Sequence, residues 1–215
     1  MVENKRRITK LNSFYGKKLE HKYMHKYFCK SRAFKATFKG SEFSHVNFRG
    51  SIMTSVSFKS CKFEGVEFLG TNLKKSNFEG ASFKDTIFVG ALLENCNFRN
   101  TTFKNVIMVN TNVNNTKNLN IHNPEITILK QYPKLEISLE LKNVLGKLVN
   151  DPYISRYRVL HLNTKKYNHL NLKILFDVLS EEQLIKGLKI MKEKNKKEIC
   201  TVSSLINYLK MVLGV

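Results

Sequence analysis

Histidine and cysteine are the residue types of this chain that would most directly suggest catalysis or metal binding. None of the six histidines lies in a recognisable motif with Ser, Cys or Asp. The four cysteines form neither a CxxC pair nor a cluster with metal-ligand spacing, and no glycine-rich loop that would cradle a phosphate is present. The sequence therefore predicts no catalytic, cofactor-binding or metal-binding residue, and a protein that is not an enzyme.

Lysine and arginine dominate the charged residues and give the 215-residue chain a formal net charge of +20. Such a surface attracts polyanions, which include nucleic acid, acidic proteins and anionic membranes. Two rows of basic residues have a spacing that could follow phosphate groups, namely Lys39, Lys59 and Arg99 in one row and Lys62, Lys84 and Lys104 in the other. Acidic residues interrupt both rows, and no exposed aromatic row accompanies them. A solvated Lys-rich surface is therefore favoured over a nucleic-acid groove.

The elements that must position these side chains follow from a comb of large apolar residues with a period of five. The comb runs from Phe28 to Val113 and holds twelve of the fifteen phenylalanines. The residue two places earlier is small in 17 of 18 cases, with Lys26 as the exception. Residues two apart in an extended segment point to the same side, so both face inward and the other three residues turn a corner. The corner positions hold six of the ten glycines and a run of asparagines from Asn95 to Asn115, as tight turns prefer.

A second period, of twenty residues, indicates a four-sided coil. Sorted by steps of twenty, the large residues fall into three columns that are mainly phenylalanine and one that is aliphatic. Four pentapeptides per coil would stack like residues on one another, so the eighteen repeats predict about 4.5 coils. At an inter-strand spacing of roughly 4.8 Å the stack would be about 22 Å tall. The expected fold is mainly a β solenoid.

Residues 26–120 resemble the pentapeptide-repeat proteins through Thr71-Asn72-Leu73, Ser76-Asn77-Phe78, Cys96-Asn97-Phe98 and Thr111-Asn112-Val113. The resemblance implies a right-handed quadrilateral β-helix. It implies little about function, because most members of that family have no known activity. The best understood members are acidic rods that look like duplex DNA, bind bacterial type II topoisomerases and protect them from quinolones. Residues 28–120 hold 13 Lys and Arg against 6 Asp and Glu, a balance of +7, so DNA mimicry is not expected.

One side of the predicted coil carries apolar residues at outward positions, where the other sides are mostly polar. A contiguous apolar patch of this kind normally has something lying on it. We predict that the helical C-terminal half covers it, and a second copy of the chain or a foreign protein remains the alternative. The patch consists of Leu69, Ile87, Val89, Ile107 and Val109, with Ile52 and Leu92 projecting from the neighbouring side. His45 occupies a corner and is expected to be exposed.

The chain outside the comb reads as a basic start and a helical end. Leu19, Tyr23 and Tyr27 have helical spacing and predict a cap over the first coil, although a degenerate repeat centred on Tyr23 is a second interpretation. Helix signals later in the chain include Pro after Asp151 and a capping box that starts at Ser180. The predicted regions are a basic segment and cap (1–27), the β-helix (28–120), a connector (121–133) and an α-helical domain (134–215).

These observations predict a cytoplasmic binding or scaffold protein that acts through protein–protein contacts. The alternative is a basic protein associated with nucleic acid or with topoisomerase–DNA complexes. Cys61 and Cys96 fall in the small inward position and are expected to be buried free thiols. No run of 18 apolar residues predicts a membrane span, and the basic N-terminus lacks the apolar stretch of a secretory signal. The expected partners are a protein or a second copy of the chain, and possible partners include nucleic acid or another polyanion.

Overall fold

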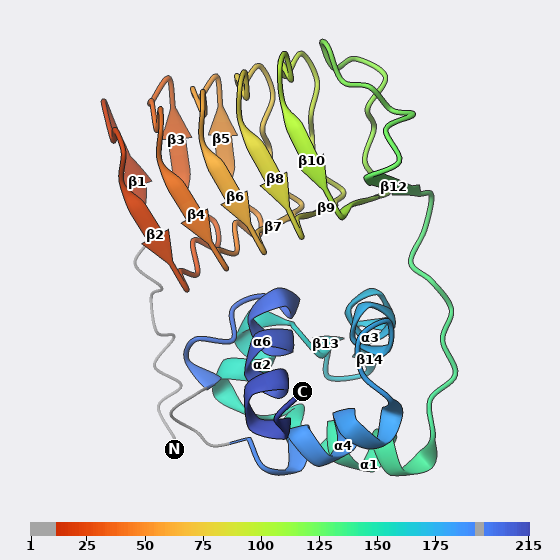
Figure 1. Ribbon diagram of the computed structural model, residues 1–215. Helices are drawn as coiled ribbons and strands as arrows, with labels where there is room; N and C mark the ends of the chain where they lie inside the picture. The colour runs from red at the N-terminus through yellow and green to blue at the C-terminus, as the bar shows by residue number, and fades with distance from the viewer. Residues whose placement is uncertain (1–11, 192–195) are drawn as a thin grey trace.

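The computed structural model describes residues 12–191 and 196–215, which form a β solenoid followed by a helical unit (Figure 1). Residues 1–11 of the predicted basic segment therefore lie outside the described residues. The solenoid strands run parallel and pair with strands twenty residues further along the chain, except that β1 pairs with β3 at a separation of nineteen. The strands are β1 Ser13–Phe14, β2 Lys22–Met24, β3 Arg32–Phe34, β4 Glu42–Ser44, β5 Ile52–Thr54, β6 Lys62–Glu64, β7 Glu67–Leu69, β8 Ser82–Lys84, β9 Ile87–Val89, β10 Thr102–Lys104, β11 Val106–Val109 and β12 Ile126–Leu129.

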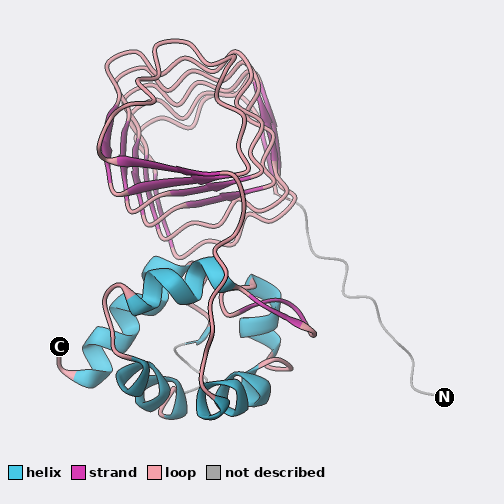
Figure 2. Cartoon of the chain, turned by 90° about the vertical axis from the view of Figure 1, so that its right-hand side faces the viewer, coloured by secondary structure: helices cyan, strands magenta, loops and turns pink. Residues whose placement is uncertain are grey.

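The coil has four sides, which Figure 2 shows in a view along the solenoid. One side contains β1, β3 and β5, the next is a ladder of single bridges, and the third contains β2, β4, β6, β8 and β10. The fourth side contains β7, β9, β11 and β12 and is called the helix-bearing side below. In chain order the bridge ladder lies two sides away from the helix-bearing side, so these two are opposite. The quadrilateral β-helix expected from the sequence is confirmed.

The solenoid is longer than predicted, with about six turns instead of 4.5. On the helix-bearing side the register links Tyr27, Asn47, Glu67, Ile87, Ile107 and Thr127, one residue from each turn. At the start, residues 12–27 form a coil and not a helical cap, because the ring of Tyr23 stacks on Phe43 with centroids 5.0 Å apart. At the end, β12 pairs with β11 and so extends the solenoid beyond residue 120. The predicted limits of 28 and 120 were too narrow.

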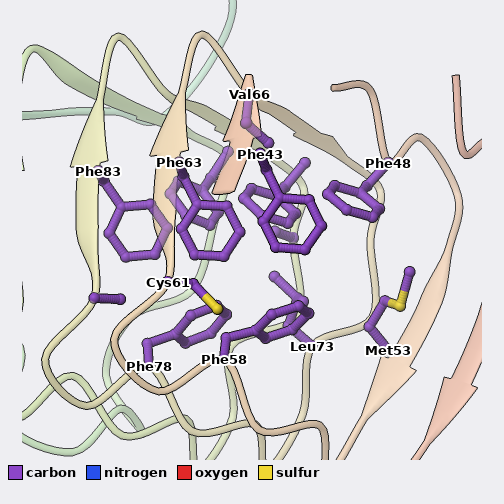
Figure 3. Packing of buried hydrophobic residues seen from close by; sticks show 14 of the residues in the cluster. Phe43, Phe48, Met53, Phe58, Cys61, Phe63, Val66, Leu73, Phe78 and Phe83 are labelled. Carbon is purple, nitrogen blue, oxygen red and sulfur yellow. The ribbon is translucent and has the colours of Figure 1, made fainter. Parts of the chain in front are cut away.

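Phenylalanine ladders fill the interior, as Figure 3 shows. Phe43, Phe63 and Phe83 stack nearly parallel, with ring centroids 5.1 and 4.7 Å apart. Neighbouring columns meet edge to face, for example Phe58 against Phe63 at 5.6 Å. Both arrangements suit the quadrupole of the ring. Every phenylalanine from residue 38 to 98 on the comb is almost completely buried, so each coil is held by contacts with the coils beside it.

The small inward residues also hold the backbone of the preceding coil. The hydroxyl of Ser76 donates to the carbonyl of Met53 at 2.7 Å, and the hydroxyl of Thr71 donates to that of Phe48 at 2.9 Å. The thiols of Cys61 and Cys96 occupy the same position, 3.0 and 2.9 Å from a carbonyl oxygen. Both thiols are free and buried, as predicted, and burial raises their pKa to about 12. They are consequently poor nucleophiles.

The helical unit packs beneath the helix-bearing side, and the connector after β12 runs along one end of the molecule to reach it (Figure 1). The helices begin at the predicted signals: Asp151 caps one helix, and Ser180 forms the expected capping box with Gln183. The helices with described bounds are α1 Leu139–Leu148, α2 Pro152–Tyr157, α3 His169–Phe176, α4 Glu181–Lys189 and α6 Val202–Leu213.

One part of the helical unit differs from the predicted all-α region. A short antiparallel hairpin separates α2 from α3, with β13 at His161–Asn163 and β14 at Lys166–Tyr167. Arg158 ends α2 because its backbone turns into the left-handed region, with φ of 60° and ψ of 31°. The backbone amide of Asn168 donates to the carbonyl of Leu160 at 2.9 Å, which closes the hairpin before α3 begins.

Candidate functional site at the joint between solenoid and helices

The predicted apolar patch lies in the joint between the solenoid and the helical unit. Ile87 and Val109 are buried in the same apolar cluster as Val202 and Leu205 of α6, and Val89 and Ile107 pack against that cluster. Leu69 is half-buried at the edge. The chain's own helices therefore cover most of this patch, which is the cover favoured from the sequence. It is not a free surface for a second copy of the chain.

The other half of the helix-bearing side is polar and is built around Glu67. One carboxylate oxygen of Glu67 accepts a hydrogen bond from the amide of Val202 at 2.7 Å, at the first turn of α6. The other oxygen accepts from the side-chain amide of Asn47 at 2.8 Å, and the same nitrogen donates to the carbonyl of Cys200 at 2.9 Å. These hydrogen bonds tie the first turn of α6 and the residue before its cap to the solenoid.

Burial raises the pKa of Glu67 to about 8, and the hydrogen bond from the Val202 amide acts in the opposite direction. Only 2% of this residue is exposed. Sequence reasoning missed Glu67, although one signal was present. Glu67 occupies the outward position of a column that continues with Ile87 and Ile107, and a carboxyl group next to apolar residues in such a column indicates a specific partner.

His45 was expected to be exposed at a corner, and that expectation is wrong. It is 9% exposed because α6 lies over it: its Nε2 is 3.2 Å from the side-chain nitrogen of Asn207. Its ring stacks on His25 at 5.0 Å, and its Nδ1 has no hydrogen-bond partner among the described residues. Burial lowers the pKa of His45, and the neighbouring His25 adds to this effect.

Gly65 allows this close approach of α6 to the solenoid. Its φ of +61° places it in the left-handed region, where a side chain is strained. A Cβ at this position would also lie 2.5 Å from His45 Nδ1 and 2.7 Å from Ser203 Cβ. Any larger residue would push α6 away from the coil.

Tyrosines and arginines complete the joint near the first coils. The hydroxyl of Tyr27 donates to the carbonyl of Arg156 at 2.8 Å, and the guanidinium of Arg49 lies 3.3 Å from the same hydroxyl. The rings of Tyr27 and Tyr157 meet edge to face at 4.9 Å. Burial raises the pKa of Tyr27 to about 12, so the hydroxyl stays protonated and can donate.

The two predicted basic rows lie on sides of the solenoid away from the joint. Lys59 pairs with Glu79 at 2.7 Å, Lys62 with Glu42 at 3.0 Å, and Lys84 with Glu64 at 2.6 Å. Lys39, Arg99 and Lys104 take part in no ion pair between described residues. Opposite charges on successive coils thus divide both rows, so neither row is a continuous cationic track.

The similarity of this chain to known proteins agrees with the coil geometry described above. The family model described as "Pentapeptide repeat region" matches residues 31–106. Residues 31–106 are a pentapeptide repeat region. No curated protein sequence matches the chain significantly.

In the described parts of the chain, no group of three or more His, Cys, Asp or Glu residues is placed to hold a metal ion. Nor is any described helix long and apolar enough to cross a bilayer.

Solved structures that resemble the chain contain the same repeat. A trypsin-treated variant of QnrB1, a plasmid-mediated fluoroquinolone resistance protein, is 16% identical, with a TM-score of 0.41, and the match covers 49% of this chain and 57% of that one. Rfr23 from the cyanobacterium Cyanothece 51142 is 15% identical over 47% of this chain and 87% of its own, with a TM-score of 0.23. HetL from Nostoc sp. PCC 7120, which is involved in regulating heterocyst differentiation, is 12% identical over 53% and 69%, with a TM-score of 0.19. This chain thus spans little more than half of the QnrB1 chain, and the helical unit lies outside the matched repeat region.

Proposed function

We propose that the protein is a non-enzymatic scaffold that binds another protein through a free side of its pentapeptide repeat region. The side formed by β1, β3 and β5 carries the supporting observation. Phe34, Ile52 and Leu92 project from it and are 61, 43 and 47% exposed. Ile52 and Leu92 share one column, two coils apart, with Asn72 between them.

Beside Leu92, hydrogen bonds and charges are already satisfied within the solenoid. Lys74 pairs with Glu94 at 2.7 Å, and the side chain of Asn72 accepts from the amide of Lys74 at 3.2 Å. A shallow hollow of about 190 Å³ lies beside Leu92. An apolar side chain of a partner protein would fit against Leu92 without leaving a polar group unpaired. A cytoplasmic location is part of the proposal and is supported by four free cysteines, three of them buried.

The experiment compares two variants of the full chain as bait for partners from the source cell. Ile52→Lys/Leu92→Lys alters the proposed side, whereas Ser82→Lys/Thr102→Lys adds the same charge to the opposite side, which contains β8 and β10. A partner that is retained by the wild type and the second variant, and lost with the first, supports the proposal. Equal retention by all three overturns it. Light scattering on the same samples tests self-association: a dimer that only the first variant dissociates would make a second copy the partner.

Nucleic acid or a topoisomerase–DNA complex is the alternative function, and the solenoid rows do not favour it. Three of their six residues are paired with carboxylates of an adjacent coil. Exposed pairs of this kind reduce the local positive potential that phosphate binding requires.

A further inference from the structure

Two adjoining hollows open at one edge of the joint, away from both basic rows. They have volumes of about 350 and 340 Å³ and share the side chains of Tyr132 and Leu162. The first is lined on the solenoid by Arg49, Leu69 and Val89 and on the helical unit by Arg158 and Asn168. The second is lined by Lys165, Lys166, Tyr167 and His169 around the β13–β14 hairpin.

The lining of both hollows is cationic and contains no Asp or Glu. Residues 152–176 contain five Lys and Arg and no acidic residue. Among described residues, Arg49, Arg158, Lys165 and Lys166 form no ion pair, in contrast to the lysines of the solenoid ladders. Glu67 is the acidic residue that acts on Tyr132, and both its oxygens accept hydrogen bonds inside the joint. The positive charge here is therefore free to act on a ligand.

Apolar and aromatic side chains also line the hollows. Tyr132 and Leu162 are half-buried where the two hollows join, and Tyr167 is half-buried in the second, with its ring stacked on His169 at 6.4 Å. Aromatic rings beside cationic groups suit a base on the ring and a phosphate next to it, and stacking on aromatic residues is tolerant of base identity. An acidic peptide would use the cations but would leave the tyrosine faces without a matching group.

Arg158 is held in place by a conformation that its residue type does not favour. It occupies the left-handed position after α2, where glycine is the usual residue. Its carbonyl accepts from the side-chain amide of Asn168 at 3.0 Å, and the next carbonyl, of Val159, accepts from Asn171 at 2.9 Å. These bonds fix the backbone beneath the guanidinium. An arginine kept at a strained, fixed position points to a use for its side chain.

We propose that these two hollows bind a short single-stranded nucleic acid, with phosphates on Arg49, Arg158, Lys165 and Lys166 and bases on Tyr132 and Tyr167. The two hollows share Tyr132 and Leu162 in their lining, so one strand could contact both. This site is separate from the protein-binding side proposed above and does not depend on it.

The test measures binding of a fluorescein-labelled 12-nucleotide single strand, as DNA and as RNA, to the full-length protein by anisotropy at several salt concentrations. Lys165→Glu/Lys166→Glu is expected to weaken binding at least tenfold and to flatten the salt dependence. Lys39→Glu/Lys104→Glu is the matched control, since it changes the net charge equally on the solenoid. We expect it to weaken binding less than threefold. Equal loss in the two variants would show that net charge alone attracts the strand and would overturn the proposal.

Two further variants separate recognition from folding. Tyr132→Leu is expected to weaken binding about five- to fiftyfold through lost stacking. Arg158→Gly is expected to weaken it about tenfold while the melting temperature stays the same or rises, because glycine accepts the left-handed conformation. A wild type that does not bind the strand contradicts the proposal. So does a strand displaced as well by inorganic phosphate, poly-glutamate or phosphatidylserine vesicles, because the site would then select only negative charge.

Discussion

The interior of the solenoid and the joint beneath it are both closed to solvent, but they are built in opposite ways. The interior repeats the same contacts many times: rings stack on rings twenty residues away, and small Ser, Thr and Cys side chains bond carbonyls 23 residues earlier. The joint consists of single contacts between distant residues, such as Glu67 with Val202 and His45 with Asn207. Stability in the first region is shared over many equivalent residues, whereas in the second it depends on a few groups that have no replacement.

The largest effect is expected from a cavity in the repeated interior. Phe78 is completely buried between Phe58 and Phe98, with centroids 5.2 Å away on each side. Phe78→Ala should lower the free energy of unfolding by about 3–5 kcal/mol. Urea denaturation followed by circular dichroism measures this change. A loss below about 1 kcal/mol would show that the coils relax to fill the gap.

A charge in the joint is expected to have the next largest effect. Val109 is completely buried under the helices, although it points outward from its coil. Val109→Asp should destabilise the protein by about 2–4 kcal/mol, since an unpaired carboxylate would be buried. Thr102→Asp, on an exposed strand position of another side, is the control and should change stability little. Similar melting temperatures for the two variants would mean that the helices do not lie on Val109.

Glu67 should make the stability of the joint depend on pH, unlike the stability of the solenoid interior. Its pKa rises from a usual 4.5 to about 8 on folding, so its contribution to stability is complete below about pH 4.5 and is lost as the pH rises towards 8. Glu67→Gln should therefore reduce the decline in stability between pH 5 and 8 by on the order of 2 kcal/mol. Denaturation midpoints at several pH values provide the measurement, and Glu79→Gln is the exposed control. An unchanged pH profile in Glu67→Gln would show that Glu67 titrates as an ordinary carboxyl.

The smallest effect is expected on the solenoid surface. Lys59 pairs with Glu79, but its side chain is 43% exposed. Exposed ion pairs are worth about 0–1 kcal/mol, so Lys59→Ala should shift the urea midpoint only slightly. A loss as large as that of Phe78→Ala would mean that the ladders of charge, and not the ring stacks, hold the coils together.

The same contrast explains what the sequence could predict. The comb from Phe28 to Val113 predicts the coil because every repeat has the same pattern of one small and one large inward residue. The first coil was misassigned since Tyr23 replaces phenylalanine in the large position and Lys26 replaces a small residue. The addition of β12 was missed because residues 114–125 do not follow the comb.

Parts of the candidate site could not be predicted from the sequence around each residue. His45 occupies a corner like any other, and only the position of α6 buries it. The hollows around Tyr132 combine side chains from three solenoid turns, the connector, the end of α2 and the hairpin. No spacing in the sequence brings Arg49 beside Arg158. Residues of this kind become visible only when the fold is known.

The joint also constrains how the gene can change. Arrays of identical units readily gain or lose a unit by duplication or deletion of the coding segment, and one coil here corresponds to twenty codons. The helical unit contacts the column at Tyr27, Asn47, Glu67, Ile87 and Ile107, five successive turns. A twenty-codon insertion between Glu67 and Ile107 would keep the coil intact but move these contacts about 4.8 Å out of step with α6. Selection for the docked helices would thus hold constant the number of turns between Tyr27 and Ile107. Related chains that keep this C-terminal unit should vary in coil number only outside that segment.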